Sequence, residues 1–199
     1  MISFKYKFIF IHAPKTAGNS IQNVLQKYSS DEVVNVRYKD GVLDKFGVQN
    51  FAGGKHATIN HYIKNWNTEY GRLEDYTVSG CVRNPWDRAT SYYFYLGNCN
   101  FNCDTFAKTS GQLSSQTSYY CANENNMLTC PISYENLQTD FNKFCDIVGI
   151  PREELPKANV SKRKTKHYTE YYQKCKNAND VIVNRFSKDI TNFGYNDGR

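Results

Sequence analysis

The sequence predicts a three-layer α/β/α fold with a central, mostly parallel sheet. Short apolar runs typical of buried strands alternate with segments whose apolar residues recur at helical spacing. Two of these strands, residues 5–11 and 76–82, end in polar loops that open into helices. Ligands of such sheets bind where parallel strands end, so these two loops are the first candidates for function.

The predicted elements follow this alternation along the chain. A strand at 5–11 precedes a helix at 17–28, whose apolar side chains Ile21, Val24, Leu25 and Tyr28 share one face. The next elements are a strand at 32–37, a helix at 59–66, a strand at 76–82, a helix at 85–96, a strand at 130–134, a helix at 137–148 and a last helix at 170–188, broken near 177–179. Neither repeats nor a low-complexity linker appear, so residues 1–199 are predicted to form a single domain. Within it, the polar stretch 97–126 is predicted to be an irregular insertion or lid that faces the acceptor of the reaction, or else a surface excursion.

Composition narrows the function classes. Hydrophobic residues make up 40% of the chain and charged residues 22%, which is typical of a globular protein. The net charge of +6 comes with no nucleic-acid-binding signature, so no nucleic-acid partner is predicted. No apolar run reaches the ~18 residues of a membrane span, and no signal peptide is visible, which favours a cytoplasmic protein.

The seven cysteines make an odd count. Cys81 and Cys145 lie in apolar runs and are predicted to be buried thiols. In an oxidising compartment Cys99 can pair with Cys103, or Cys121 with Cys130, but reduced thiols are favoured here. No metal site is predicted from these spacings.

The first loop has the features of an anion site. A strand that feeds a helix directs backbone N–H groups and the positive end of the helix dipole at one point. Lys15 adds a charge there, and Gly18 allows close approach to the backbone. The loop is not a Walker A motif, because its lysine precedes the glycine. An ordinary strand–turn–helix is the alternative.

The second loop follows the strand at 76–82. Asn84 is a suitable N-cap and Pro85 suits the first helical position, which places Arg83 at the end of the strand. Ser91 lies about two turns along the same helix. An arginine fork and a hydroxyl can hold one phosphate between them. The alternative is a surface arginine and an incidental serine.

Together these loops resemble the 3′-phosphoadenosine-5′-phosphosulfate (PAPS)-dependent sulfotransferases. The sequence PKTAGNS at 14–20 is similar to the family's 5′-phosphosulfate loop, and VRNPWDRATSYYF at 82–94 is similar to its 3′-phosphate element, both closest to the carbohydrate (Golgi-type) branch. Weaker similarity covers ISYENL at 132–137, LPKANVS at 155–161 and residues 189–195. The resemblance implies a P-loop-NTPase-like fold, PAPS as co-substrate, PAP (adenosine 3′,5′-bisphosphate) as product, no metal, and a hydroxyl-bearing acceptor, most simply a glycan. It also places the protein in the Golgi lumen if this chain is part of a longer protein.

The resemblance assigns roles to particular residues. Lys15 would stabilise the leaving phosphate during in-line transfer, and Arg83 with Ser91 would hold the 3′-phosphate. The remaining nucleotide-binding candidates are Thr16, Ala17, Gly18, Asn19, Ser20, Tyr134, Ser161 and Lys162. Trp86 can stack on the nucleotide, although a core position is favoured.

The acceptor hydroxyl needs a base, for which histidine is the usual residue near neutral pH. His56, in a GGKH loop before a helix, is the first candidate, and His12 is the second. His61 is expected at the surface, and nothing singles out His167. Asp104 and Glu124 come next if no histidine serves.

Two other functions fit parts of the sequence. An ATP-dependent P-loop-like kinase would need a metal-binding aspartate after a strand and the opposite glycine–lysine order. A non-catalytic nucleotide- or glycan-binding module would bind the same ligands without turnover.

Overall fold

The computed structural model describes residues 1–37, 43–46, 54–157, 167–173 and 175–196. The chain folds into two compact units. The first, which we call the sheet unit, comprises Met1–Val82 and Tyr119–Asn159. The second, which we call the helical unit, comprises Arg83–Ser118 and Val160–Arg199.

The sheet unit contains a four-stranded sheet in the order β1-β2-β5-β8. Its strands are β1 (Ile2–Ser3), β2 (Phe8–Ile11), β5 (Thr77–Val82) and β8 (Cys130–Ser133). The last three strands run parallel to one another, and β1 pairs antiparallel with β2. The predicted α/β class with a mostly parallel sheet is therefore confirmed.

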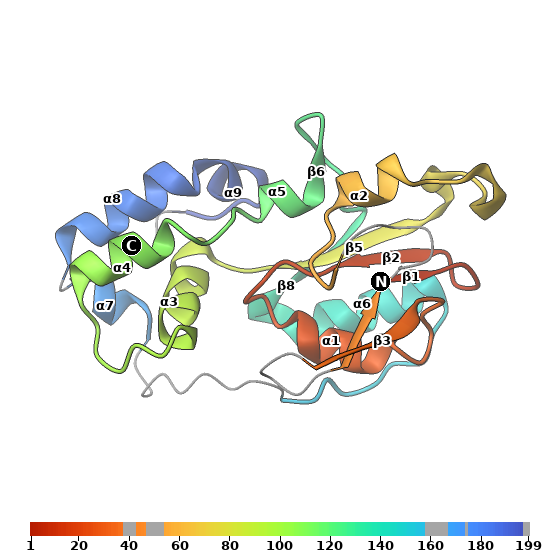
Figure 1. The fold of residues 1–199 in the computed structure, drawn as a ribbon, viewed down its shortest axis with the longest axis horizontal. Helices are drawn as coiled ribbons and strands as arrows, with labels where there is room; N and C mark the ends of the chain where they lie inside the picture. The colour runs from red at the N-terminus through yellow and green to blue at the C-terminus, as the bar shows by residue number, and fades with distance from the viewer. Residues whose placement is uncertain (38–42, 47–53, 158–166, 174, 197–199) are drawn as a thin grey trace. The chain divides into compact units, whose positions relative to one another are not determined.

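Helices cover both faces of this sheet (Figure 1). Helices α1 (Gly18–Leu25) and α6 (Leu137–Val148) lie on one face, and α2 (Ile59–Lys64) lies on the other. Because side chains alternate along a strand, Phe8 and Phe10 of β2 enter the core beneath α1 and α6. The ring of Phe8 packs edge-on against Phe144 of α6, with ring centroids 5.5 Å apart. This packing anchors β2 to α6.

The predicted first strand is shorter than expected. Lys7 has φ 49°, a left-handed conformation that a strand cannot contain, so β2 begins only at Phe8. The unit's other strands form two antiparallel pairs, β3 (Glu32–Arg37) with β4 (Leu43–Phe46), and β6 (Cys121–Ala122) with β7 (Asn125–Asn126). Its short 3₁₀ helices are η1 (Thr68–Tyr70), η2 (Leu73–Asp75) and η3 (Tyr134–Asn136).

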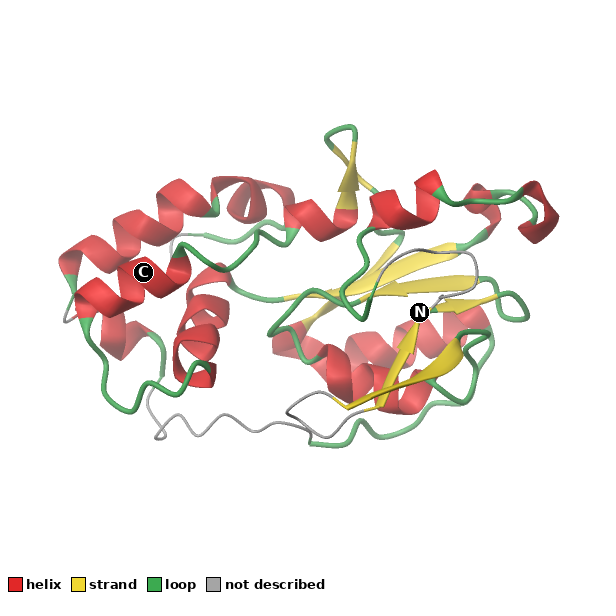
Figure 2. Cartoon of the chain, in the orientation of Figure 1, coloured by secondary structure: helices red, strands yellow, loops and turns green. Residues whose placement is uncertain are grey.

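The described part of the helical unit contains helices and loops but no strand (Figure 2). Its helices are α3 (Pro85–Tyr95), α4 (Cys103–Ser110), α7 (Thr169–Gln173), α8 (Lys176–Arg185) and α9 (Ser187–Asn192), while α5 (Thr117–Tyr120) crosses the boundary between the units. The Asn84 carboxamide oxygen accepts from the backbone N–H groups of Trp86 and Asp87, at 3.0 and 3.2 Å. The predicted cap of this helix is confirmed.

Trp86 belongs to the core of the helical unit. Its side chain is 1% exposed, and its indole N–H donates to the carboxamide oxygen of Asn179 at 2.7 Å. The ring packs in a cluster with Tyr93, Phe106 and Phe186. The favoured core position is confirmed, and stacking on a nucleotide is not available to a side chain so placed.

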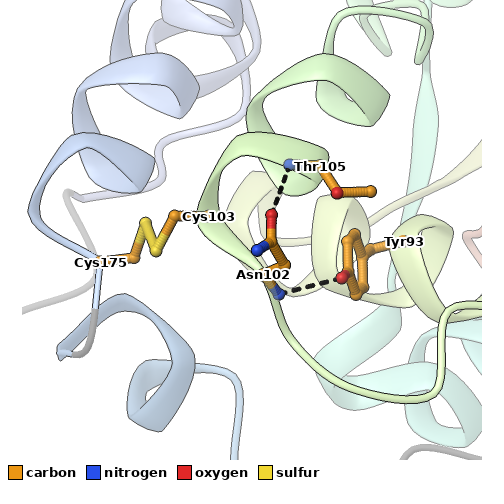
Figure 3. Close-up of a disulfide and its surroundings, with 5 residues drawn as sticks. All are labelled: Tyr93, Asn102, Cys103, Thr105 and Cys175. Atoms are coloured by element: carbon orange, nitrogen blue, oxygen red, sulfur yellow. Dashed lines mark hydrogen bonds between the residues drawn. A yellow bond between two sulfur atoms is a disulfide. The ribbon is translucent and has the colours of Figure 1, made fainter.

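The stretch 97–126 is not irregular as predicted, because it contains α4, α5 and the β6–β7 hairpin. The last predicted helix is also interrupted elsewhere than expected. Residues 177–179 lie inside α8, and the interruptions fall before Lys176 and at Phe186. Cys175, the residue before α8, has an extended φ of −138° and forms a disulfide with Cys103 of α4 (Figure 3).

This disulfide corrects the predicted cysteine chemistry. Cys103 pairs with Cys175, 72 residues away, and not with Cys99. Cys121 and Cys130 are both buried thiols, so the reduced state favoured for them is confirmed and the alternative pair does not form. Reduced thiols were expected throughout, which does not hold for Cys103 and Cys175. The prediction that Cys81 and Cys145 are buried thiols is confirmed.

Candidate functional site

The loop between β2 and α1 is tightly built. Ala13 and Thr16 are fully buried, and the Thr16 hydroxyl donates to the Ala13 carbonyl at 2.8 Å. The Ser20 N–H donates to the Ala17 carbonyl at 3.0 Å, which starts the helix. The Thr16 side chain therefore closes the turn, and the Ser20 N–H belongs to the helix.

Two residues of this loop adopt the left-handed conformation. Lys15 has φ 69° and Ala17 has φ 64°, and neither is a glycine. This conformation costs an ordinary residue about 1–2 kcal/mol, and such costs concentrate at binding sites. Successive N–H groups in a turn that visits the left-handed region form concave anion sites. Ala17 is also the N-cap of α1 and has no side chain with which to cap it. The loop thus has the backbone form of an anion cradle, and the half-buried Lys15 is one of its residues.

Gly18 is required by His12 rather than by backbone freedom. A β-carbon on Gly18 would lie 2.0 Å from Cδ2 and 2.3 Å from Nε2 of the His12 ring. The His12 ring is buried, and its Nδ1–H donates to the carboxamide oxygen of Gln22 at 2.9 Å. Gln22 lies one turn into α1. The ring therefore fills the space beside Gly18 and joins the end of β2 to the start of α1.

His56 lies directly against His12. The two rings meet edge to face, with centroids 4.6 Å apart, and His56 Nδ1 donates to the backbone carbonyl of His12 at 2.7 Å. That bond places the ring proton of a neutral His56 on Nδ1 and the lone pair on Nε2. The structure thus brings His56 against His12, 44 residues away in the sequence, while the His12 ring lies beside Gly18.

The electrostatics of this cluster keep His12 neutral. Burial lowers the pKa of His12 well below 6.5, and the nearby positive charges of His56 and Lys55 lower it further, against a smaller opposing effect of the Gln22 hydrogen bond. Lys55 is itself only 6% exposed. Sequence reasoning overlooked Lys55, whose only signal was its position beside His56.

The other predicted residues of the sheet unit lie apart from this cluster. His61 belongs to the capping box of α2, where its Nδ1 accepts from the Thr58 N–H at 3.1 Å. Tyr134 packs against the core formed by α1, α6 and the sheet. Ser161 and Lys162 lie outside the described residues. His167, in the helical unit, has its Nδ1 2.9 Å from the Thr169 hydroxyl.

Arg83, the second predicted anion ligand, is 6% exposed and begins the helical unit. Its Nε and Nη2 both donate to one carboxylate oxygen of Asp87, at 2.9 and 2.7 Å. Ser91 follows Asp87 by four residues on α3, so the two side chains lie on one face of the helix. The guanidinium is thus held near the face that carries the 5%-exposed Ser91.

A buried polar network supports Arg83, and sequence reasoning did not find it. The network contains Gln116 and Asp189, both fully buried, and the 1%-exposed Arg88. Their partners are far away in the sequence and carry no local pattern. The one signal was a charged residue, Arg88, within a helix whose neighbouring residues Trp86 and Ala89 are apolar.

In the part of the chain that the structure describes, none of the helices is long and apolar enough to cross a membrane. That part of the chain also holds no cluster of three or more histidine, cysteine or acidic side chains arranged to bind a metal ion.

Comparison with models of protein families gives a match over nearly the whole chain. The sulfotransferase family matches residues 1–196 of the 199-residue chain. No curated protein matches the chain.

Proposed function

The chain belongs to the sulfotransferase family, and from this premise we propose that it moves the sulfuryl group of PAPS onto a carbohydrate hydroxyl. The family consists of PAPS-dependent enzymes, so the chain is a sulfotransferase and its acceptor carries a hydroxyl group. This sets aside the kinase and the non-catalytic binding module. The carbohydrate acceptor is supported by the two loop motifs at 14–20 and 82–94, which are most similar to the carbohydrate branch.

The observation that carries the proposal is the anion cradle between β2 and α1. Its left-handed Lys15 and Ala17 and the N-terminus of α1, which lacks a side-chain cap, suit a phosphate or sulfate group. The Lys15 ammonium would stabilise the charge that develops on the leaving phosphate. The backbone N–H groups of residues 15–19 and the Ser20 hydroxyl are the other proposed ligands.

Arg83 and Ser91 are the proposed ligands of the 3′-phosphate. The Asp87 carboxylate holds one edge of the guanidinium through Nε and Nη2. A guanidinium held in one orientation is suited to recognition of a tetrahedral anion, because its planar fork matches the spacing of the anion's oxygens. This pair would distinguish PAPS from nucleotides that lack a 3′-phosphate.

His56 is the proposed general base. Its Nδ1–H is committed to the His12 carbonyl, so Nε2 would accept the proton of the acceptor hydroxyl. As that proton leaves, the acceptor oxygen would bond to sulfur, and the bond from sulfur to the phosphate oxygen would break in line. The products are a sulfate ester and PAP. The stretch 97–126 is the proposed contact with the acceptor.

Calorimetry and a transfer assay test this function. PAP should bind the protein at least about tenfold more tightly than 5′-AMP, since each charge-assisted hydrogen bond contributes about 1.5–3 kcal/mol. ADP and ATP should bind as weakly as 5′-AMP. Equal affinity for PAP and 5′-AMP would refute the role of Arg83 and Ser91.

The transfer assay uses PAPS with a panel of glycans and small alcohols. Lys15→Ala should lower kcat far more than it lowers PAP affinity, because its contact strengthens in the transition state. The matched control is Lys143→Ala, which removes an exposed lysine of α6 bonded to Asp140. Unchanged kcat in Lys15→Ala would exclude the proposed role of the lysine.

A further inference from the structure

Arg83 is fixed at its backbone as well as at its side chain. The Arg83 N–H donates to the carboxamide oxygen of Gln116 at 2.8 Å, and the Gln116 amide nitrogen donates to the Arg83 carbonyl at 2.8 Å. One side chain therefore satisfies both backbone groups of one residue. With the guanidinium held by Asp87, Arg83 has few remaining degrees of freedom.

Gln116 is fixed in turn by a buried carboxylate. The Gln116 N–H donates to Asp189 Oδ2 at 2.7 Å, and the Thr117 N–H donates to Oδ1 of the same carboxylate at 2.8 Å. Asp189 is fully buried in the first turn of α9. Its two oxygens thus hold the backbone of the Gln116–Thr117 segment in one position.

Arg88 completes the network. Its Nη1 lies 3.9 Å from Asp189 Oδ2 and donates to the Ser114 carbonyl at 2.9 Å. The same segment is therefore held from both sides, by an arginine of α3 and an aspartate of α9. Arg88 lies only five residues after Arg83, so the contacts from Arg83 through Gln116 and Asp189 to Arg88 return to the same segment of chain.

Filling a core with such a polar network has a high cost in free energy. Burying a charged pair costs desolvation free energy that its attraction often fails to recover, and apolar side chains of equal volume are commonly as stable. Hydrogen bonds within a buried polar network favour one geometry over the alternatives, because breaking one of them is penalised. Here the two hydrogen bonds of the Gln116 side chain end on the backbone of a single residue, the arginine proposed to bind the 3′-phosphate.

We propose that Gln116, held by Asp189, is a positioning residue that aims Arg83 and thereby sets the preference for a nucleotide with a 3′-phosphate. This inference rests on the proposed function of Arg83. It assigns to Gln116 a specificity role that would be exerted through Arg83, without contact to the ligand.

The test compares the affinities of PAP and 5′-AMP by calorimetry in four variants. In Gln116→Met the side chain keeps a similar volume but loses both hydrogen bonds to Arg83. Asp189→Asn keeps the size of the carboxylate but replaces one acceptor oxygen with a donor. Asn102→Ala is the control, since it removes the cap that Asn102 supplies to the Thr105 N–H of α4 (Figure 3). Arg83→Ala reports on the proposed function itself.

We expect Gln116→Met to lower the ratio of PAP affinity to 5′-AMP affinity by about tenfold, as for one lost charge-assisted hydrogen bond. Asp189→Asn should lower the ratio in the same direction, because it loosens Gln116. Asn102→Ala should lower the melting temperature and leave the ratio unchanged. A purely structural role of Gln116 would lower stability without changing this ratio.

The failures are distinguishable. If the wild type does not prefer PAP, or Arg83→Ala keeps the preference, the proposed function of Arg83 fails. If Arg83→Ala loses the preference while Gln116→Met and Asp189→Asn keep it, only the positioning role fails. If Gln116→Met does not fold, the affinity ratio of Asp189→Asn decides. If neither variant folds, the network serves stability and the proposal is overturned.

Discussion

Acid should destabilise this protein through His12. Burial is the main cause that lowers the pKa of His12 below its usual value of 6.5 in the folded state. The unfolded chain then binds a proton below pH 6.5 that the folded chain does not bind. Because stability rises with pH wherever the unfolded state binds more protons, the contribution of His12 is lost as the pH falls below 6.5.

The expected change in the free energy of unfolding follows from the binding of this single proton. Each pH unit well below the unfolded pKa costs about 1.4 kcal/mol as long as folded His12 stays neutral. Between pH 7.5 and pH 5.5 the free energy of unfolding therefore falls by about 1.4 kcal/mol. Only the unit below the unfolded pKa of 6.5 contributes fully, because above it the unfolded chain binds little of the proton. Against a typical stability of about 5–15 kcal/mol this is readily measured.

Urea unfolding of the wild type and of His12→Phe at both pH values measures the effect. Other groups titrate in both proteins, so the difference between the two free energies of unfolding isolates His12. That difference should shift by about 1.4 kcal/mol in favour of His12→Phe at the lower pH. The control Ile11→Val, in the neighbouring buried position, should lose about 1 kcal/mol equally at both pH values. A pH-independent difference for His12→Phe would refute the reasoning.

Three further predictions concern single positions. His56→Ala should keep its PAP affinity and lose transfer by about 10²–10⁴-fold, together with the acidic limb of the pH–rate profile, and a wild-type rate would show that His56 is not the base. Gly18→Ala should destabilise the fold by about 1–3 kcal/mol, because its β-carbon would meet the His12 ring at 2.0 Å. In a His12→Ala background the same change should cost less, and an equal cost in both backgrounds would contradict the contact. Cys103→Ser should lower the free energy of unfolding by up to about 4 kcal/mol, which is the entropic contribution of closing a loop of 72 residues. It should also make the melting temperature insensitive to reductant. The control Cys99→Ser, at a free cysteine, should keep that sensitivity.

The elements that sequence reasoning placed well are those with local causes. The cap at Asn84 and Pro85 predicted the start of α3, and helix 137–148 has the bounds of α6. Both rest on hydrogen bonds and apolar spacing within a few residues of chain. The β2–α1 loop was also located from the sequence, because an apolar strand, a lysine and a helix start are all visible there.

The errors and omissions all involve contacts between distant residues. The sequence indicated that Gly18 allows close approach of a ligand to the backbone, but it did not show that Gly18 makes room for the His12 ring or that Lys15 and Ala17 take the left-handed conformation. The β6–β7 hairpin and helices α4 and α5 in 97–126 were not predicted, because short elements in a polar sequence depend on the residues they pack against.

What the sequence by itself determined is the α/β alternation, the family and the positions of the two loops proposed to bind anions, since each of these depends on consecutive residues. Only the tertiary structure decided how the candidate residues are supported. It paired Cys103 with Cys175, set His56 against the carbonyl of His12, 44 residues away, and placed Gln116 between Arg83 and Asp189, at separations of 33 and 73 residues. No local pattern encodes such pairs, because they form only when the sheet and the helices bring distant side chains within hydrogen-bonding reach.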